Sequence, residues 1–240
     1  MTENLKIGVT GAAGRMGRMV VAAVHDDSGC TLVGAAEAPR SDALGQDAGL
    51  AAGLAQAGIA ITDDASSVFA AADAVIDFTA PAATRTHAGL AAETGTSFVC
   101  GTTGLDEEDR NAIAAAARVV PVLWAPNMSM GVNLLLGLVK SAAAALPAAD
   151  IEIVESHHRY KVDAPSGTAL ALGRAAAAGR GVRLEDVQKL SREGITGERP
   201  AGEIGFATLR GGDIAGEHTV MLSMDGERIE LTHRATNRLI

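Results

Sequence analysis

The stretch that decides the fold of the first half reads Leu5-Lys6-Ile7-Gly8-Val9-Thr10-Gly11-Ala12-Ala13-Gly14-Arg15-Met16-Gly17. The apolar run over 5–10 predicts a strand, and the helical periodicity over 15–25 predicts a helix directly after the glycines. The glycines have the spacing G-x-x-G-x-x-G, a variant of the G-x-G-x-x-G turn of dinucleotide-binding folds with Ala13 at its middle glycine. We interpret 11–17 as a turn that brings backbone N–H groups to a pyrophosphate.

An acidic residue stands where such a turn needs one to bind a ribose. Glu37 lies about twenty residues after the turn, at the end of a second predicted strand, where its carboxylate can bind both ribose hydroxyls. Ala38 follows it, and the nearest cation is Arg40, so NADH is mildly favoured and NADPH stays possible through Arg40. The alternative is a glycine turn that binds nothing, but the order of strand, turn, helix and acid favours dinucleotide binding.

The order of the predicted elements indicates two domains. In the first half, alanine-rich helical stretches separate apolar runs that predict strands at 5–10, 31–36, 74–78, 97–100 and 119–124. This alternation predicts a parallel sheet covered on both faces, a doubly wound α/β domain of the Rossmann type over 1–127. Over 128–240 the pattern changes to helices at 133–146 and 166–178 and strands at 151–155, 205–210, 217–222 and 228–233. The last three strands alternate, which predicts an α+β domain with a mixed or antiparallel sheet.

Composition excludes several classes of function. The chain of 240 residues has 20 Lys and Arg against 29 Asp and Glu, a net charge of −9, and only 2% aromatic residues. It therefore lacks the cationic surface and stacking platforms of a nucleic-acid-binding protein. It contains no apolar run of membrane-spanning length and no signal-peptide pattern, and two cysteines are too few for a disulfide framework. We expect a cytoplasmic protein that binds neither nucleic acid nor a membrane.

A cationic cluster interrupts this acidity. His157, His158, Arg159 and Lys161 follow the predicted strand 151–155 within five positions. In a chain of net charge −9, such a local reversal attracts an anionic substrate. Histidine exchanges a proton near neutral pH, and lysine can anchor a carboxylate or donate a proton to a developing carbanion.

The segment Pro165-Ser166-Gly167-Thr168 opens the next helix, where backbone N–H groups and hydroxyls suit a carboxylate. One alternative for the whole cluster is a solvated basic loop. Another is a metal site that uses Glu155, His157, His158 and Asp163. Adjacent histidines on a strand point to opposite faces, so the metal site is the least favoured interpretation and we predict no metal.

Two later loops, Gly101-Thr102-Thr103-Gly104 and Ala125-Pro126-Asn127-Met128-Ser129, follow predicted parallel strands. Ligands bind at the carboxyl ends of such strands, so these loops are candidates for the nicotinamide ribose and carboxamide, although ordinary turn chemistry explains either loop taken alone. Of the remaining histidines, we expect His218 and His233 to be hydrogen-bonded within strands. We expect His25 and His87 to face solvent from helices.

Several of these motifs together resemble one enzyme family. The turn 11–17, the loop 101–104, residues 127–133 and above all 155–170 are similar to the 4-hydroxy-tetrahydrodipicolinate reductases, also called dihydrodipicolinate reductases. The string His-His-x-x-Lys…Pro-Ser-Gly-Thr is the most specific part, and the resemblance extends over essentially the whole chain. It implies reduction of the cyclic product of an aldol step to tetrahydrodipicolinate with NADH or NADPH, in the diaminopimelate route to lysine.

The resemblance also implies roles for single residues. His157 would be the proton donor and acceptor, Lys161 the proton donor, and His158, Gly167 and Thr168 the ligands of the substrate carboxylates, with Ser166 beside them. The cofactor would be held by Gly11, Ala12, Ala13, Gly14, Arg15, Met16, Glu37, Gly101, Thr102, Thr103, Ala125, Pro126, Asn127 and Met128. The second domain would bind the dicarboxylate substrate and build a homotetramer through its sheet.

The chain departs from the family at three places. Ala13 stands where a glycine is frequent, and Ala38 stands where an arginine often reads the 2′-phosphate of NADPH. The chain stops at Ile240, whereas family members continue with a helix and a terminal segment. Two further interpretations therefore stand beside the reductase: a related imine or enamine reductase, and a catalytically impaired redox sensor that binds NAD(P) and lacks this segment.

Overall fold

The apolar runs of the first half form one parallel sheet in the computed structural model, which describes residues 4–236. The sheet has the order β3-β2-β1-β4-β5-β6, and every neighbouring pair is parallel. Its strands are β1 (Leu5–Thr10), β2 (Cys30–Ala36), β3 (Ile61–Thr62), β4 (Ala74–Asp77), β5 (Ser97–Cys100) and β6 (Val122–Trp124). The strand order reverses at β1, which lies between β2 and β4, and such a switch point is where ligands bind in open α/β sheets.

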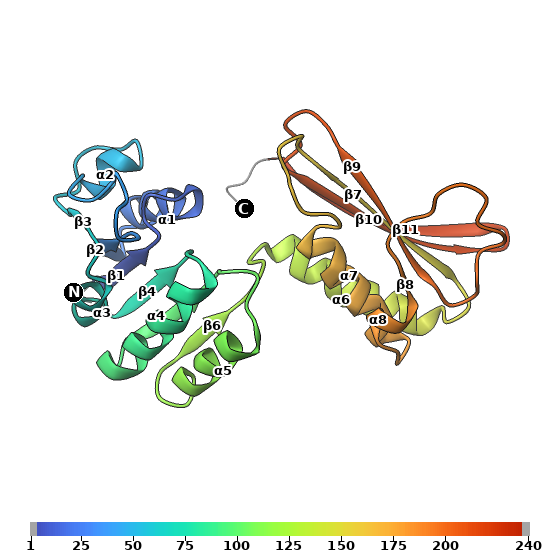
Figure 1. Cartoon of the computed structure of the whole chain (residues 1–240), viewed down its shortest axis with the longest axis horizontal. Helices are drawn as coiled ribbons and strands as arrows, with labels where there is room; N and C mark the ends of the chain where they lie inside the picture. Colours follow the sequence, from blue (N-terminus) through green and yellow to red (C-terminus); the bar gives the residue numbers. More distant parts are fainter. Residues whose placement is uncertain (1–3, 237–240) are drawn as a thin grey trace. The chain divides into compact units, whose positions relative to one another are not determined.

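Helices cover both faces of this sheet (Figure 1). They are α1 (Arg15–Asp26), α2 (Ala48–Ala51), α3 (Ala65–Ala71), α4 (Pro81–Thr94) and α5 (Glu107–Ala116). The apolar side chains of α1 and α2 pack on one face, with Ile7 and Val9 of β1, and those of α3, α4 and α5 pack on the other. This arrangement confirms the predicted doubly wound fold. The sequence reasoning missed the two-residue strand β3, whose length is below what periodicity detects.

Glycines inside the strands allow one helix to approach the sheet closely. A Cβ on Gly8 would lie 2.6 Å from Val68 of α3, and one on Gly34 would lie 3.0 Å from the same side chain. Both glycines therefore serve helix packing.

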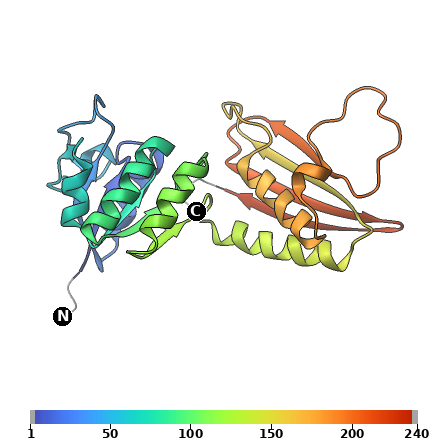
Figure 2. The same ribbon diagram turned by 60° about the horizontal axis from the view of Figure 1, so that its bottom comes forward.

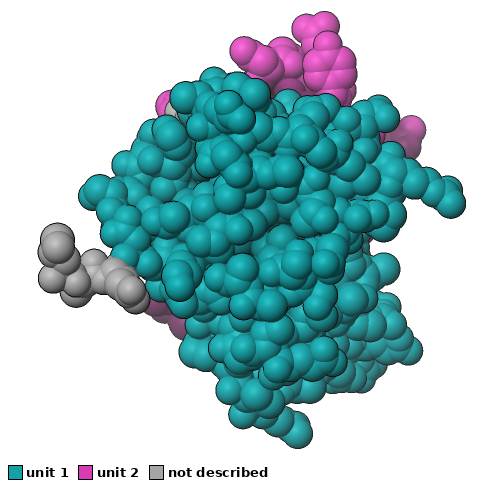
Figure 3. Space-filling view, turned by 90° about the vertical axis from the view of Figure 1, so that its left-hand side faces the viewer, with its two compact units in different colours: residues 1–126 teal, residues 127–240 magenta. Residues whose placement is uncertain are grey.

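The chain divides after Pro126 into two compact units, unit 1 and unit 2, whose described residues are 4–126 and 127–236 and which Figure 3 shows in different colours. Unit 2 contains a sheet of order β11-β10-β7-β9-β8. Its elements are α6 (Met130–Ala145), β7 (Asp150–His157), α7 (Gly167–Gly179), α8 (Leu184–Val187), β8 (Gln188–Lys189), β9 (Ile204–Arg210), β10 (Gly216–Met224) and β11 (Glu227–Ala235). The central strand β7 pairs parallel with β9 and antiparallel with β10, so the sheet is mixed, as predicted.

The two long helices of unit 2 lie side by side along one face of this sheet (Figure 1, Figure 2). Leu135 and Val139 of α6 and Leu172 of α7 form one core with Ile151 and Ile153 of β7. Serine caps set where both helices begin. Ser129 accepts a hydrogen bond from the Val132 N–H and Ser166 accepts one from the Ala169 N–H. Because of the cap at Ser129, α6 starts three residues before the predicted helix at 133.

The strand β7 is longer than the predicted 151–155. Its pairing with β9 continues to His157, which lies opposite Arg210. Its side chains alternate strictly between partly buried and buried positions over all eight residues. The period of two therefore places Glu155 and His157 on the same face as Ile151 and Ile153, toward the helices.

Among the described residues, no helix has both the length and the apolar character that crossing a bilayer requires. Within the same part of the chain, no three His, Cys, Asp or Glu side chains are grouped so that they could hold a metal ion.

Candidate functional site

The glycine turn of unit 1 is built around positions that exclude any side chain. Gly11 has φ 72°, a conformation that favours glycine, and a Cβ there would collide with the carbonyl oxygen of Phe78. A Cβ on Gly17 would collide with the carbonyl oxygen of Gly11. Gly14 precedes α1 in an extended conformation, and no described side chain caps that helix. The first turn of α1 thus presents backbone N–H groups, which is the arrangement that binds a phosphate.

Hydrogen bonds of the Glu37 carboxylate connect this turn to the end of β2. Its Oε2 accepts a hydrogen bond of 3.0 Å from the Ala13 N–H, and its Oε1 accepts one of 2.9 Å from the Ala38 N–H. A carboxylate oxygen has more than one acceptor position, so both oxygens can also accept from ribose hydroxyls. The turn and the acid therefore fit a dinucleotide.

A cavity of about 390 Å³ opens at the carboxyl ends of β1 to β4. It is lined by Thr10, Ala36, Glu37, Ala38, Pro39, Asp63, Ala65, Phe78, Thr79, Ala80, Ala83 and His87. A largely apolar hollow with a few polar groups is typical of a small-molecule site. Of the predicted site residues, Glu37 lines this cavity.

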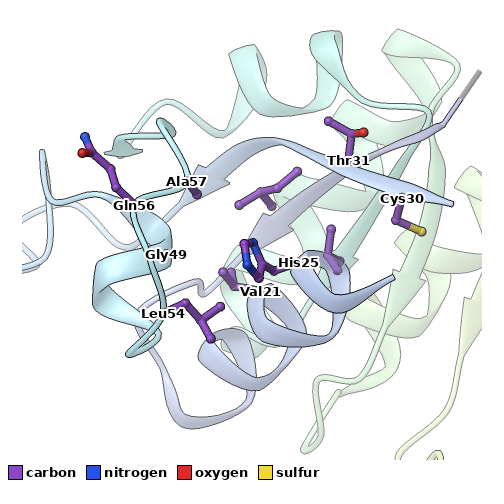
Figure 4. A pocket seen from close by; sticks show the side chains of 10 residues that line it. Val21, His25, Cys30, Thr31, Gly49, Leu54, Gln56 and Ala57 are labelled. Carbon is purple, nitrogen blue, oxygen red and sulfur yellow. The ribbon is translucent and has the colours of Figure 1, made fainter. Parts of the chain in front are cut away.

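A second cavity, of about 280 Å³, lies elsewhere in unit 1 (Figure 4). Side chains of α1 and β2, among them His25 and Thr31, line it together with Leu54 and Gln56 from the segment after α2. None of the predicted site residues lines this cavity.

A buried carboxylate joins the strand ends at the first cavity. Asp77, the last residue of β4, is 0% exposed. Its carboxylate accepts hydrogen bonds from six described side chains: Thr10 (2.7 Å), Thr79 (2.8 Å), Thr84 (2.7 Å), Thr102 (3.3 Å), Nδ1 of His87 (3.1 Å) and Sγ of Cys100 (3.8 Å). Burial by itself would raise the pKa of Asp77, but the bonds from His87, Thr10 and Thr84 outweigh it and hold the pKa below its usual value. The charge thus ties β1, β4, α4 and the loop after β5 together.

The prediction that His87 faces solvent is wrong. His87 is only 9% exposed, because its ring nitrogen binds Asp77 and its ring packs at 5.7 Å from that of Phe69. His25 is exposed, as expected.

The loop 101–104 is also organised by this network. The Thr102 hydroxyl donates to Asp77 and accepts from the Thr79 N–H at 3.1 Å, so it points into the protein. Gly101 packs so closely against the Phe78 ring that a Cβ would overlap it. Thr103 is exposed, and Ala125 and Pro126 follow β6 at the same edge of the sheet.

The remaining predicted cofactor residues, Asn127 and Met128, belong to unit 2. There the Asn127 side-chain amide donates to the Thr168 hydroxyl at 3.2 Å, and its oxygen accepts from the Ser129 N–H. A predicted cofactor residue is thus bonded to a predicted substrate residue.

In unit 2 the carboxylate of Glu155 is a buried hydrogen-bond acceptor. This carboxylate is 0% exposed and accepts from Nδ1 of His157 at 2.6 Å, from the Ser166 N–H at 3.0 Å and from both Nη atoms of Arg210 at 2.8 and 2.9 Å. Burial alone would raise the pKa of Glu155, but the bonds from Arg210, His157 and the Ser166 N–H hold it below its usual value.

His218 completes the surroundings of His157. Their rings meet edge to face at 5.1 Å, and Nε2 of His218 shares a hydrogen bond of 2.9 Å with Oγ of Ser166. Burial, followed by the electrostatic influence of the neighbouring His157, lowers the pKa of His218 to about 4, so the ring of His218 is neutral at pH 7. His233 lies opposite His218 in the antiparallel pair of β10 and β11.

Lys161 is held near the same cluster by an ion pair. Its Nζ binds both carboxylate oxygens of Asp163 at 2.7 and 2.8 Å, and the Asp163 carbonyl accepts from Nη2 of Arg210 at 2.7 Å. His158 accepts from the Tyr160 N–H at 3.2 Å. Gly167 and Thr168 are the first two residues of α7, directly after the Ser166 cap.

Sequence reasoning missed Arg210 as a functional candidate. It lies far from His157 along the chain, and only the parallel register of β7 and β9 places the two opposite each other. A local motif cannot supply this pairing.

Sequence models of one family match both units. The model described as "Dihydrodipicolinate reductase, N-terminus" matches residues 5–128, and that described as "Dihydrodipicolinate reductase, C-terminus" matches residues 131–240. The 4-hydroxy-tetrahydrodipicolinate reductase of Parvibaculum lavamentivorans is 55% identical over 242 residues, which cover 100% of this chain and 89% of that protein. That of Dinoroseobacter shibae is 54% identical and covers 100% of this chain and 90% of that protein.

The fold is also similar to solved structures. The dipicolinate-bound dihydrodipicolinate reductase from Paenisporosarcina sp. TG-14 superposes with a TM-score of 0.76 at 26% identity, covering 98% of this chain and 89% of that chain. GenD2 from gentamicin A biosynthesis, solved in complex with NAD, has a TM-score of 0.58 at 16% identity, covering 97% of this chain and 73% of that chain. The second similarity concerns the fold alone.

The Asp77 network predicts a pH-dependent contribution to stability. Asp77→Asn replaces an acceptor by an NH₂ group among donors, so we expect the free energy of unfolding at neutral pH to fall by about 2 kcal/mol. Because the folded state lowers the pKa of Asp77 below 3.8, the charged form stabilises above that value and its contribution disappears as the pH falls through the folded value. The difference between the two proteins, measured by urea unfolding, should therefore shrink below about pH 4.

The matched control is Asp42→Asn, at an exposed position of the same unit. It should change the free energy of unfolding by less than about 0.5 kcal/mol at every pH. A loss for Asp77→Asn that is equally small would contradict the role of the network.

Proposed function

The chain belongs to the dihydrodipicolinate reductase family, and we propose that it reduces 4-hydroxy-tetrahydrodipicolinate to tetrahydrodipicolinate with a nicotinamide cofactor, in the diaminopimelate route to lysine. Both family models match, and the relatives that carry the name of this activity are 50–55% identical over nearly the whole chain. The names of these relatives support the reductase and not the alternative interpretation as a catalytically impaired redox sensor. The observation that carries the proposal within the structure is the buried His157–Glu155 pair beside Lys161 and the start of α7.

The cofactor site fits a dinucleotide by its backbone geometry. Gly11 and Gly17 leave no room for side chains, and Glu37 stands beside a cavity at the switch point of the sheet. The residues that would hold the cofactor are Gly11, Ala12, Ala13, Gly14, Arg15, Met16, Glu37, Gly101, Thr102, Thr103, Ala125, Pro126, Asn127 and Met128. When bound, the nicotinamide supplies the hydride.

The substrate is a dianion, and unit 2 offers it cations and N–H groups in a chain of net charge −9. His158, Ser166, Gly167 and Thr168 would bind its carboxylates, the last three from the start of α7, where backbone N–H groups and the helix dipole favour an anion. The reductase from Paenisporosarcina sp. TG-14 was solved with dipicolinate, a flat ring with two carboxylates, and this ligand of a relative supports the same chemistry here.

Two side chains would transfer protons in this reaction. In the reaction, one hydride enters ring C4, one proton enters the neighbouring carbon, and one water leaves. His157 binds Glu155 through Nδ1, which leaves Nε2 to give or take a proton. Lys161 carries three donor hydrogens and would protonate the carbanion or enamine that the hydride creates.

Lys161→Ala should lower kcat/KM by about 100-fold or more, because a positioned proton donor contributes about 10²–10⁴-fold. Pyruvate, aspartate semialdehyde and the upstream synthase generate the substrate in place, and the loss of NADH absorbance reports turnover. Lys140→Ala, at an exposed position of α6, is the control and should keep full activity. Full turnover by Lys161→Ala would refute its assignment, and no oxidation by the folded wild type would refute the reductase.

We propose that NADH serves at least as well as NADPH. The 2′-phosphate of NADPH needs a cation beside the ribose, whereas Glu37 is followed by Ala38 and its carboxylate binds the Ala38 N–H. The ratio of kcat/KM for the two cofactors tests this. Arg40→Ala should lower kcat/KM for NADPH and leave that for NADH unchanged. A preference of about tenfold or more for NADPH in the wild type would contradict the proposal.

We further propose a homotetramer that assembles through the sheet of unit 2. The helices pack on the face of Ile151 and Ile153, and the opposite face carries partly buried side chains such as Val154 and Met221. Sedimentation equilibrium should give four times the chain mass of 24.3 kDa. Met221→Glu should lower this mass, whereas Leu134→Glu, on the exposed side of α6, should not. A monomeric wild type would contradict the assembly.

A further inference from the structure

The carboxylate of Glu155 occupies a place where the fold itself needs none. It follows Ile151 and Ile153 on the helix-facing side of β7 and is as fully buried as they are. A buried charge is costly, and apolar residues of similar volume often replace a buried ion pair without loss of stability. The presence of an ionised group here therefore indicates a role in the site.

We propose that Glu155 and Arg210 act as one positioning unit that sets the tautomer of His157 and connects it to the segment that holds Lys161. This inference rests on the proposed function for its catalytic consequence. Its structural part concerns side chains of unit 2 alone. Both residues act through His157 and Lys161, and neither is assigned contact with the substrate.

Glu155 fixes the tautomer of His157. Both oxygens of Glu155 are occupied by donors: Oε2 by His157 Nδ1 and Arg210 Nη1, and Oε1 by the Ser166 N–H, Arg210 Nη2 and, at 3.3 Å, the Thr208 hydroxyl. An ionised carboxylate only accepts hydrogen bonds, so Nδ1 of His157 must carry a hydrogen. The neutral ring then keeps its lone pair on Nε2, the atom that can exchange a proton with a substrate.

A glycine position limits the space around Nε2 of His157. Gly216 lies next to it, and a Cβ at that position would come within 3.0 Å of Nε2. The neighbouring ring of His218 is neutral and has its Nε2 engaged by Ser166. A side chain at position 216 would therefore crowd Nε2 of His157, and Nε2 of His218 is already engaged by Ser166.

Arg210 connects Glu155 to the segment that holds Lys161. Nη2 of Arg210 donates both to Glu155 and to the backbone carbonyl of Asp163, whose carboxylate holds Lys161 Nζ. One guanidinium therefore binds the partner of His157 and the segment of Lys161. The parallel register that sets Arg210 opposite His157 makes this double contact possible.

The test begins with Glu155→Gln. The amide turns one acceptor oxygen into a donor NH₂, and we expect this NH₂ to face Nδ1 of His157, because a ring nitrogen can become an acceptor whereas the Ser166 N–H and Arg210 cannot. When it faces Nδ1, the ring hydrogen moves to Nε2. Long-range ¹H–¹⁵N spectra of histidine-labelled protein report the tautomer, and the loss of one signal set in His157→Gln assigns the ring. We expect Nδ1–H in the wild type and a shift toward Nε2–H in Glu155→Gln.

The matched control is Glu152→Gln. Glu152 lies on the same strand, is also paired with two arginines, Arg192 and Arg199, and faces the other side of the sheet. It should leave both the His157 tautomer and kcat unchanged. Glu155→Gln should lower kcat about 10–100-fold, as loss of an orienting partner does in metal sites, without changing KM for NADH.

Arg210→Gln supplies a second variant at the partly exposed end of β9. It should lower kcat but keep the Nδ1–H tautomer, because Glu155 stays an acceptor. If the two residues act as one unit, the kcat of the double variant should be no more than about threefold below that of the less active single variant. Losses that multiply, or an unchanged tautomer in Glu155→Gln, would overturn the proposal.

Failure of this inference is distinguishable from failure of the proposed function. A wild type that binds pyridine-2,6-dicarboxylate in calorimetry and shows the Nδ1–H tautomer, but does not oxidise NADH with substrate, would contradict the reductase and leave the structural part supported. A wild type that turns over with His157 in the Nε2–H tautomer would contradict the positioning unit alone.

Discussion

The rest of this structure depends on the cost of burying a carboxylate. Asp77 ends β4 in unit 1 and Glu155 lies two residues before the end of β7 in unit 2, and both are fully buried. An ionised group in such a place is tolerated only when donors surround it. Asp77 therefore gathers hydroxyls and a histidine from β1, α4 and two loops, and Glu155 gathers Arg210, His157 and the start of α7. In each unit the charge holds together the elements that carry the site.

The two carboxylates use different partners, and the difference suits different tasks. Neutral hydroxyls dominate around Asp77, so its network is a rigid support beneath the cavity at the sheet edge. Around Glu155 a guanidinium neutralises the charge, and Nδ1 of His157 donates to the same carboxylate. The first network holds strand ends and loops of unit 1 together. The second orients the ring of His157.

The glycines of the turn in unit 1 differ in how much space their backbone contacts leave for a side chain. Gly11 and Gly17 are required by close backbone contacts, whereas a Cβ on Gly14 would meet only the Gly11 carbonyl oxygen, at 3.1 Å. Ala13 stands where a glycine is frequent, and its N–H is bound by Glu37. The bond from the Ala13 N–H to Glu37 thus connects this part of the turn to the end of β2.

The amino-acid sequence by itself determined the two-domain α/β and α+β architecture, the glycine turn with its acid, and the cluster from His157 to Thr168. Periodicity and local motifs act over short distances along the chain, so these features are readable without a structure. Tertiary structure alone decided that His87 is buried against Asp77, that Thr102 points inward, and that Arg210 reaches Glu155 and Asp163. These contacts depend on strand order and register, which bring together residues that are far apart in sequence, and no local pattern encodes that register.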